Sequence, residues 1–340
     1  MKHAIRTATV FAFASLCLCS GAGAKLVTFQ VPGGMYLAGM NDKGQVTGWY
    51  IDNRTTAFHG FLRQPDNTVT TFDVPAALTT KQNGFLPPEE TIPSGISEDG
   101  VITGQYGINH MGGGSFIRAA SGAITPFSVG LTTVPYGISP TGWIVGRYRL
   151  EGTHRFHAFL RDPTGAKQDV SVPGAHNATY PSVVNRSRAI AGVAGFANGS
   201  QAFFRPAHGK AAVFGDSHAE GVAVTGINVA GTVVGYFAQA AEWRQCVSFF
   251  RTSDGTITTF TGPDGATDTK AYAINKAGTI AGTYIDSSNK EHGFIRAGDG
   301  TLKTVDVEGA AYTDVRFINN KGEIAGTYYN NGTYGFVGKP

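Results

Sequence analysis

The chain has 340 residues, of which 47 are glycine and 15% are charged, and its formal net charge is +3. The glycine content is about twice the usual level of roughly 7%, but no G-X-Y period accompanies it, which excludes a collagen. With 22 Phe and 13 Tyr to bury, the composition also differs from that of a disordered chain.

The first 24 residues have the pattern of a secretory signal peptide. Lys2 and Arg6 precede an apolar run over residues 8–19, and residues 22–24 (Ala-Gly-Ala) form a small-residue cleavage site before Lys25. The run is shorter than the roughly 20 residues that a membrane-spanning helix needs. We therefore expect cleavage between Ala24 and Lys25 and a secreted or periplasmic protein without a membrane anchor.

Loss of this leader would change the charge and the cysteine count. It leaves 25 basic and 24 acidic residues, and such a neutral chain lacks the clustered positive charge that nucleic-acid binding needs. Cys17 and Cys19 leave as well, so Cys246 has no partner for an internal disulfide. The sequence predicts no cofactor, no nucleic-acid partner and a monomer, with stability supplied by packing.

One unit of about 46 residues recurs seven times along the rest of the chain. Its most regular part reads roughly G-I-N-x-x-G-x-I-V-G-x-Y, and a phenylalanine follows it in every copy. The copies begin at Gly39, Gly95, Gly137, Val183, Gly226, Ala273 and Phe317. A fixed period of this length indicates a repeat architecture rather than two unrelated domains.

Each copy predicts four short antiparallel strands, because its segments alternate apolar and polar residues between turn sequences. Four strands in about 40 to 50 residues are typical of a β-propeller blade. The seventh copy ends after its third strand, whereas Lys25–Pro32 matches a fourth strand that belongs to no copy. We predict an all-β fold, a single seven-bladed propeller over residues 25–340, closed when the N-terminal strand joins the C-terminal blade.

Three copies carry a histidine, a small residue and a phenylalanine. Residues 157–159 read His-Ala-Phe, and residues 59–61 and 292–294 read His-Gly-Phe. Together with the neighbouring Gly-Ile-Asn and Ile-Val-Gly elements, they resemble the probable extracellular HAF-repeat family, although the fourth copy departs from the pattern at Arg188 and Ala194. The resemblance implies an exported bacterial repeat protein, and it implies no catalytic residues because the family has no established activity.

Recurring residues are first assigned to packing, since a ligand site rarely repeats sevenfold. This assignment covers the isoleucines and mid-strand glycines of the motif, with the aromatic residue two places later as the expected partner of each glycine. The arginine that ends the third strand in six copies is expected to bond to carbonyls of the next blade. Threonine precedes the motif by four residues in five copies, where it would either bind a polar ligand at the channel mouth or hold only water: Thr91, Thr133, Thr179, Thr269 and Thr313.

The links that differ between copies supply the other candidate residues, because loops on a rigid scaffold usually carry function. The longest link, residues 76–93, includes Glu89 and Glu90 and would either cover the channel mouth or only decorate the surface. His154 and Arg155 lie in the link of the third copy. His154 could ligate a metal together with His157 or exchange protons, but spacing shows no third metal ligand there, so no metal site is predicted.

Trp243 is the candidate in the fifth copy, where a charged residue stands on either side of it. Its ring would either stack on a sugar or anchor a partner protein, or it would only pack at the rim.

Standard catalytic motifs such as HExxH, GxSxG and the P-loop are missing from the sequence. The sequence therefore favours an exported binding module that presents one loop-rich face to a glycan or a protein. The alternative is an extracellular hydrolase or lyase that acts on polysaccharide or lactone-type substrates, with Glu89, Glu90 or His154 as acid or base. Two carboxylates or histidines within about 5–9 Å at the channel mouth would favour the enzyme.

Overall fold

The structure is a computed structural model that describes residues 10–11, 15–18, 25–75, 90–107, 114–152, 155–175, 179–215, 219–239, 245–263 and 265–340. Every regular element in these ranges is a β-strand, so the predicted all-β class is confirmed. The same ranges contain no helix of the length and apolarity needed to cross a membrane.

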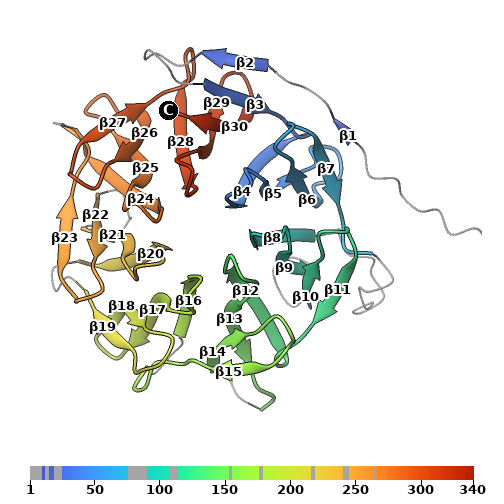
Figure 1. The fold of residues 1–340 in the computed structure, drawn as a ribbon, viewed down its shortest axis with the longest axis vertical. Helices are drawn as coiled ribbons and strands as arrows, with labels where there is room; N and C mark the ends of the chain where they lie inside the picture. Colours follow the sequence, from blue (N-terminus) through green and yellow to red (C-terminus); the bar gives the residue numbers. More distant parts are fainter. Residues whose placement is uncertain are drawn as a thin grey trace, which may run out of the picture.

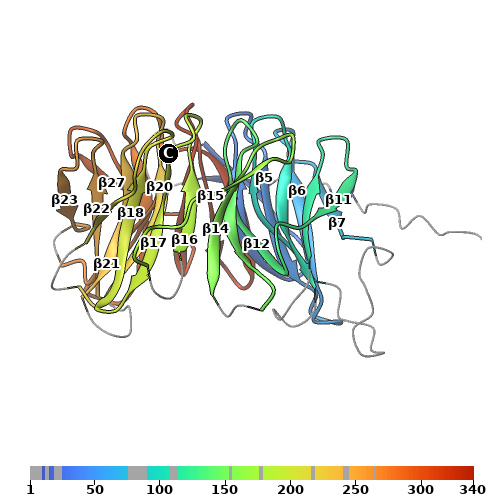
Figure 2. The same cartoon turned by 90° about the horizontal axis from the view of Figure 1, so that it is seen from below.

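The strands form antiparallel sheets that stand side by side around a central axis (Figures 1 and 2). Four sheets consist of four consecutive strands each. The first contains β12 (Thr132–Ile138), β13 (Ile144–Arg149), β14 (Phe156–Arg161) and β15 (Lys167–Asp169). The second contains β16 (Thr179–Val184), β17 (Ile190–Phe196), β18 (Gly199–Arg205) and β19 (Ala212–Phe214). The third contains β20 (Gly221–Ile227), β21 (Val233–Ala238), β22 (Cys246–Arg251) and β23 (Ile257–Phe260). The fourth contains β24 (Asp268–Ile274), β25 (Ile280–Ile285), β26 (Glu291–Arg296) and β27 (Leu302–Val305).

The early part of the chain forms a nine-stranded sheet that contains the same four-strand pattern twice. One set runs from β4 (Gly34–Met40) through β5 (Val46–Ile51) and β6 (Phe58–Arg63) to β7 (Val69–Phe72). The other runs from β8 (Glu90–Ile96) through β9 (Ile102–Gly107) and β10 (Gly114–Arg118) to β11 (Ile124–Phe127). A single parallel pair between Phe58 and Glu90 joins the two sets, and β1 (Val10–Phe11) pairs with β7.

The last sheet joins the two ends of the chain. β28 (Tyr312–Ile318), β29 (Ile324–Tyr329) and β30 (Thr333–Lys339) are followed in the sheet by β3 (Lys25–Phe29) and β2 (Ser15–Leu18). β3 pairs with β30 over five residue pairs, from Lys25–Lys339 to Phe29–Gly335. The predicted pairing of the N-terminal strand with the last three strands is therefore confirmed.

Close approach of phenylalanine rings explains the mid-strand glycines. Gly48 pairs with Phe61 across the sheet, and a Cβ atom on Gly48 would lie 2.8 Å from the Phe61 ring and closer still to the carbonyl oxygen of Tyr36. The third-strand phenylalanines are fully buried, and in six of the four-strand sets the ring approaches the mid-strand glycine in this way. The prediction that each glycine packs against the aromatic residue two positions later, such as Tyr50, was wrong. A residue two positions along a strand lies beside the glycine rather than over it.

The third-strand arginines also differ from expectation. Arg118 lies 4.8 Å from the ring of Phe72, and Arg161 lies 5.1 Å from the ring of Phe127, so each guanidinium packs on a fourth-strand ring of the preceding four-strand set. Arg161 donates to the carbonyl of Asp162 in its own turn rather than to a neighbouring sheet. These arginines join adjacent sheets through cation–π contacts, which suit guanidinium groups because their charge is delocalised.

The asparagine of the Gly-Ile-Asn motif connects neighbouring sheets around the axis. Its carboxamide oxygen accepts N–H groups within its own hairpin, and its amide group donates to a carbonyl of the next sheet. Asn319 completes this pattern, because its amide donates to the carbonyl of Asn41 at 3.3 Å and so joins the last sheet to the first. The equivalent bonds run from Asn41 to Ser97, Asn185 to Asn228, Asn228 to Asn275 and Asn275 to Asn319.

We expect Asn319→Ala to lower the free energy of unfolding by about 1–3 kcal/mol, because it leaves the Asn41 carbonyl and the N–H groups of Lys321 and Glu323 without their partner. Denaturant unfolding measures the change. The exposed neighbour is the control, since Lys321→Ala should stay within about 0.5 kcal/mol. Equal stabilities of the two variants would show that this ring of amides contributes nothing.

Candidate functional site

Cavities lie at both ends of the inner strands. One, of about 460 Å³, is lined by recurring residues of the motif, including Ile138, Ile227, Ile318 and the asparagines that connect the sheets. Because the same residues recur around this cavity and bond to backbone, it is a product of the repeat. The other cavity, of about 410 Å³, lies where the last sheet meets β4 and has no such repetition.

We call this second cavity the seam pocket. It is lined by Gly34, Met35, Tyr36 and Leu37 from β4, Glu291 from β26, Tyr312, Asp314 and Arg316 from β28, Thr327 from β29 and Thr333 from β30. Most of these residues lie where their strands begin. In an antiparallel four-strand sheet, the link between the second and third strands and the connection to the next sheet emerge at that same end. The pocket is therefore on the face where sequence analysis expected function.

A β-bulge in the inner strand positions the charged pair of the pocket. The register shifts between Val315 and Phe317, which leaves Arg316 as the extra residue of the bulge. The Arg316 Nε atom lies 2.6 Å from the Asp314 Oδ2 atom. Asp314 pairs with Thr327, and the residues with the same register in the other inner strands are Tyr36, Ile92, Val134, Tyr180, Ala223 and Lys270. The repeat thus carries acidic charge at this position in its last copy alone.

Two carboxyl groups of the pocket are placed where ionisation is unfavourable. Asp314 is 8% exposed, and burial raises the pKa of its carboxyl although Arg316 opposes the shift. Glu291 is half-buried, and burial together with the nearby Asp314 charge raises the pKa of its carboxyl as well. Carboxyl groups with raised pKa values in one cavity are typical of binding and catalytic sites.

Aromatic rings form the apolar part of the pocket. The ring of Tyr36 stacks on Trp49 with centroids 4.2 Å apart, and 51% of Tyr36 is exposed. The ring of Tyr312 stacks on Tyr329 at 5.9 Å across the last sheet. Because each ring is supported on one face by its neighbour, its orientation is fixed while part of it remains free for a ligand.

None of the recurring threonines lines the seam pocket. All five are buried, with exposures of 1–5%, and each hydroxyl accepts a backbone N–H from the link that precedes it. These bonds run to Thr91 from Val74, to Thr133 from Val129, to Thr179 from Val172, to Thr269 from Gly262 and to Thr313 from Val307. The threonines therefore fix the links to the inner strands, and we leave them out of the candidate site.

The candidates from the variable links are not brought together. Glu90 is 7% exposed at the start of β8, where it pairs with Gly107, and Arg155 is exposed before β14. Neither residue lines the seam pocket. Glu89, His154 and Trp243 lie outside the described residues.

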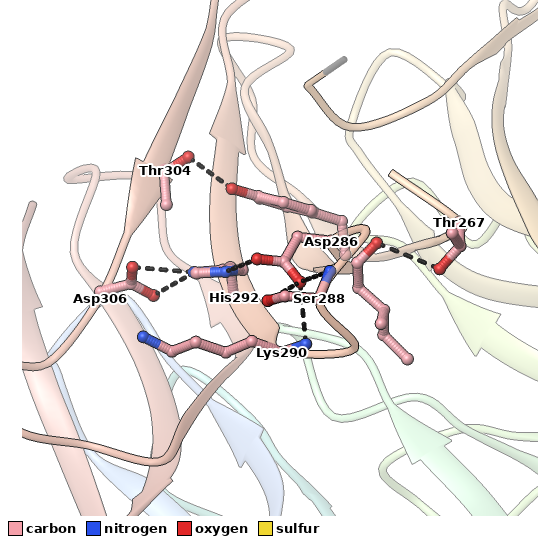
Figure 3. Close-up of polar contacts among 9 residues, drawn as sticks. Thr267, Asp286, Ser288, Lys290, His292, Thr304 and Asp306 are labelled. Atoms are coloured by element: carbon pink, nitrogen blue, oxygen red, sulfur yellow. Dashed lines mark hydrogen bonds and ion pairs between the residues drawn. The ribbon is translucent and has the colours of Figure 1, made fainter. Parts of the chain in front are cut away.

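The motif histidines form a separate set of polar contacts on the outer strands. Figure 3 shows His292 between Asp306, whose carboxylate lies 2.9 and 3.0 Å from Nδ1, and Asp286, 3.2 Å from Nε2. The N–H of Lys290 and the Ser288 hydroxyl, among other donors, hold the pKa of Asp286 well below its usual range. His59 with Asp73 at 2.8 Å and His157 with Asp169 at 3.4 Å repeat the pairing, so the histidine joins the third strand to the fourth.

Two further kinds of site find no support within the described ranges. Cys246 is buried, and burial raises the pKa of its thiol to about 12, so it is not a thiolate nucleophile near neutral pH. No group of three or more His, Cys, Asp or Glu residues suited to a metal ion occurs among the residues that the structure describes.

Known proteins share the fold but not a close sequence relationship. No protein-family model and no curated protein matches the chain. A streptogramin B lyase structure aligns with a TM-score of 0.57 and 14% identity over 92% of this chain and 96% of that one. Virginiamycin B lyase from Staphylococcus aureus aligns with a TM-score of 0.57 and 14% identity over 93% of this chain and 100% of that one. The β-propeller domain of the Trilobed protease from Pyrococcus furiosus aligns with a TM-score of 0.55 and 10% identity over 87% of this chain and 92% of that one.

At these identities the comparisons establish a β-propeller fold alone. They do not identify a ligand, so the ligand has to be inferred from the residues of the seam pocket. These residues were not among the candidates taken from the sequence. The available signal was positional, because aligning the copies residue by residue places Lys270 and Asp314 where the others are uncharged.

Proposed function

We propose that this chain is an exported seven-bladed β-propeller that binds a glycan in the seam pocket. The observation that carries the proposal is the combination of Tyr36, exposed on one wall, with Glu291, Asp314 and Arg316 on the other. An aromatic face packs against the C–H groups of a sugar ring, and carboxylate and guanidinium groups bond to its hydroxyls.

The seven blades are supported by counting the four-strand units. The two sets in the nine-stranded sheet, the four separate sheets and the sheet closed by β3 supply one unit for each sequence copy. The bulge in the inner strand also recurs in each unit, as at Leu37/Gly39 and Val315/Phe317. The export signal, the HAF-type repeats and the neutral charge of residues 25–340 are in keeping with an extracellular or periplasmic protein.

A small ligand is favoured over a protein partner by the shape of the site. A cavity of about 410 Å³ lies in the range of about 300–1,000 Å³ typical of small-molecule pockets. A protein interface would instead need an extended surface of roughly 800 Å² on each partner.

The test is a glycan screen of the purified protein, followed by calorimetry with the best ligand. We expect Tyr36→Ala to weaken binding about tenfold or more, a loss of about 1.4 kcal/mol or more, because the stacking surface is lost. Tyr180→Ala is the matched control, since Tyr180 has the same register position on β16 and is 37% exposed but lies outside the pocket. Equal affinities of the two variants, or no glycan bound by the native protein, would contradict the proposal.

A hydrolase or lyase acting on the same class of ligand is the second candidate function. The specific observation is that Glu291 and Asp314 share one pocket and both have raised carboxyl pKa values, which is the property of a general acid. The structural neighbours include lyases, although they support the fold only. Release of a new reducing end or an unsaturated sugar from a bound glycan would select this function.

A further inference from the structure

The charges around the seam pocket do not balance. The carboxylate of Asp268 on β24 lies 2.7 Å from the Lys270 Nζ atom, and the carboxylate of Asp314 lies 2.6 Å from Arg316. Each cation is therefore already paired with one carboxylate. Glu291 on β26 faces the same group of charges, and its carboxylate makes no hydrogen bond or ion pair with any described residue. With all three acids ionised, the pocket carries one negative charge in excess.

A second observation comes from Asp314 itself. Its Oδ2 atom bonds to Arg316, but its Oδ1 atom is buried and has no hydrogen-bond partner among the described residues. An unsatisfied buried acceptor is costly, and native structures rarely leave one without a ligand, a water or an ion. The acceptor belongs to a residue that lines the pocket.

We propose that the glycan bound in the seam pocket carries a protonated amino group, which lies between the carboxylates of Glu291 and Asp314. This inference rests on the proposed glycan-binding function. An ammonium group supplies the missing positive charge and up to three N–H donors. The π faces of Tyr36 and Tyr312, which line the same pocket, favour a cation as well. An anionic sugar would add to the negative excess, and a neutral sugar would leave Glu291 charged and unpaired.

The pH dependence follows from the groups that face the ammonium. These groups are Glu291 on β26, Tyr312, Asp314 and Arg316 on β28, and Asp268 and Lys270 on β24. Tyr36 completes the set on β4. The two carboxyl groups that receive the ammonium have raised pKa values in the free protein, and a bound cation lowers them. Binding of the amino sugar therefore releases protons, and its affinity falls as the pH drops through the pKa of Glu291.

The experiment compares two sugars with the same skeleton, the trimer of glucosamine and the trimer of N-acetylglucosamine, by calorimetry at about pH 6, where an amine is protonated. We expect the native protein to bind the glucosamine trimer at least tenfold more tightly. Glu291→Gln keeps the size of the side chain but removes its charge, and should abolish this preference. Glu220→Gln, at an exposed carboxylate outside the pocket, should leave the preference intact.

The results that would contradict the amino-group inference differ from those that would contradict glycan binding. Equal binding of both trimers, or a preference that survives Glu291→Gln, would overturn the amino-group inference and leave glycan binding in place. Failure to bind either trimer, combined with an empty glycan screen, would overturn the glycan-binding function itself.

Discussion

Removal of residues 25–31 is expected to lower the melting temperature by about 5 °C or more, whereas removal of residues 1–24 alone leaves it unchanged. The segment contributes β3, in which Leu26 is fully buried and Phe29 is 2% exposed. Burial of each such side chain is worth about 1.5–3 kcal/mol, and an unfolding entropy of about 2.1 cal/mol/K per residue makes each kcal/mol correspond to about 1.5 °C in a chain of this length. Loss of β3 would also expose the backbone edge of β30, which invites aggregation.

Calorimetric melting of three chains measures this effect: the full chain, residues 25–340 and residues 32–340. The chain that begins at Lys25 is the control, because it matches the expected mature protein. A peptide of residues 25–32 added to the shortest chain should recover part of the lost stability. If the shortest chain melted with the same transition as the control, the ring would not depend on closure by the N-terminal strand.

Arg316→Met is expected to lower the free energy of unfolding by about 3 kcal/mol at neutral pH. The substitution leaves the buried Asp314 carboxylate without its cation, which typically costs about 3–5 kcal/mol. We expect the lower end of that range because 41% of the Arg316 side chain is exposed and water screens its charge. Burial already raises the pKa of Asp314 in the folded state, so the folded protein binds a proton there more readily than the unfolded chain does. The penalty is therefore largest above the folded pKa and fades as the pH falls below it.

Chemical denaturation of the variant at neutral and acidic pH tests this expectation. The repeat itself supplies the control, because the third copy has Val134 and Tyr136 where the last copy has Asp314 and Arg316. The double variant Asp314→Val with Arg316→Tyr should recover most of the lost stability, since it removes both charges together. A penalty that grows toward acidic pH, or a double variant as unstable as Arg316→Met, would contradict a buried charge as the cause.

The architecture was predictable because repetition averages out local ambiguity. A single copy, such as residues 39–61, offers only short strand signals, whereas seven copies show which features are structural. The unpaired segment at Lys25–Pro32 predicted the closing sheet, and its pairing with β30 confirms that part of the argument. The errors concerned contact partners, as with Gly48, where the sequence does not show which ring lies over the glycine.

The residues of the seam pocket were not among the candidates taken from the sequence. The links were expected to carry function, and Glu90 and Arg155 were therefore chosen, but the seam pocket is built mainly from residues within or at the start of strands. Glu291 stands directly before His292 and was overlooked beside that recurring motif. Asp314 and Arg316 are two residues apart on β28, at the bulge between Val315 and Phe317, whose register is set by pairing with β29.

The most direct measurement for the central claim is a crystal structure of the protein with the oligosaccharide that binds best in the glycan screen. We predict sugar density in the seam pocket, with a ring packed on Tyr36 and a polar group of the sugar against Glu291. Density in the opposite cavity, which the recurring asparagines line, or on the outer strands around His292 would contradict the assignment of the site.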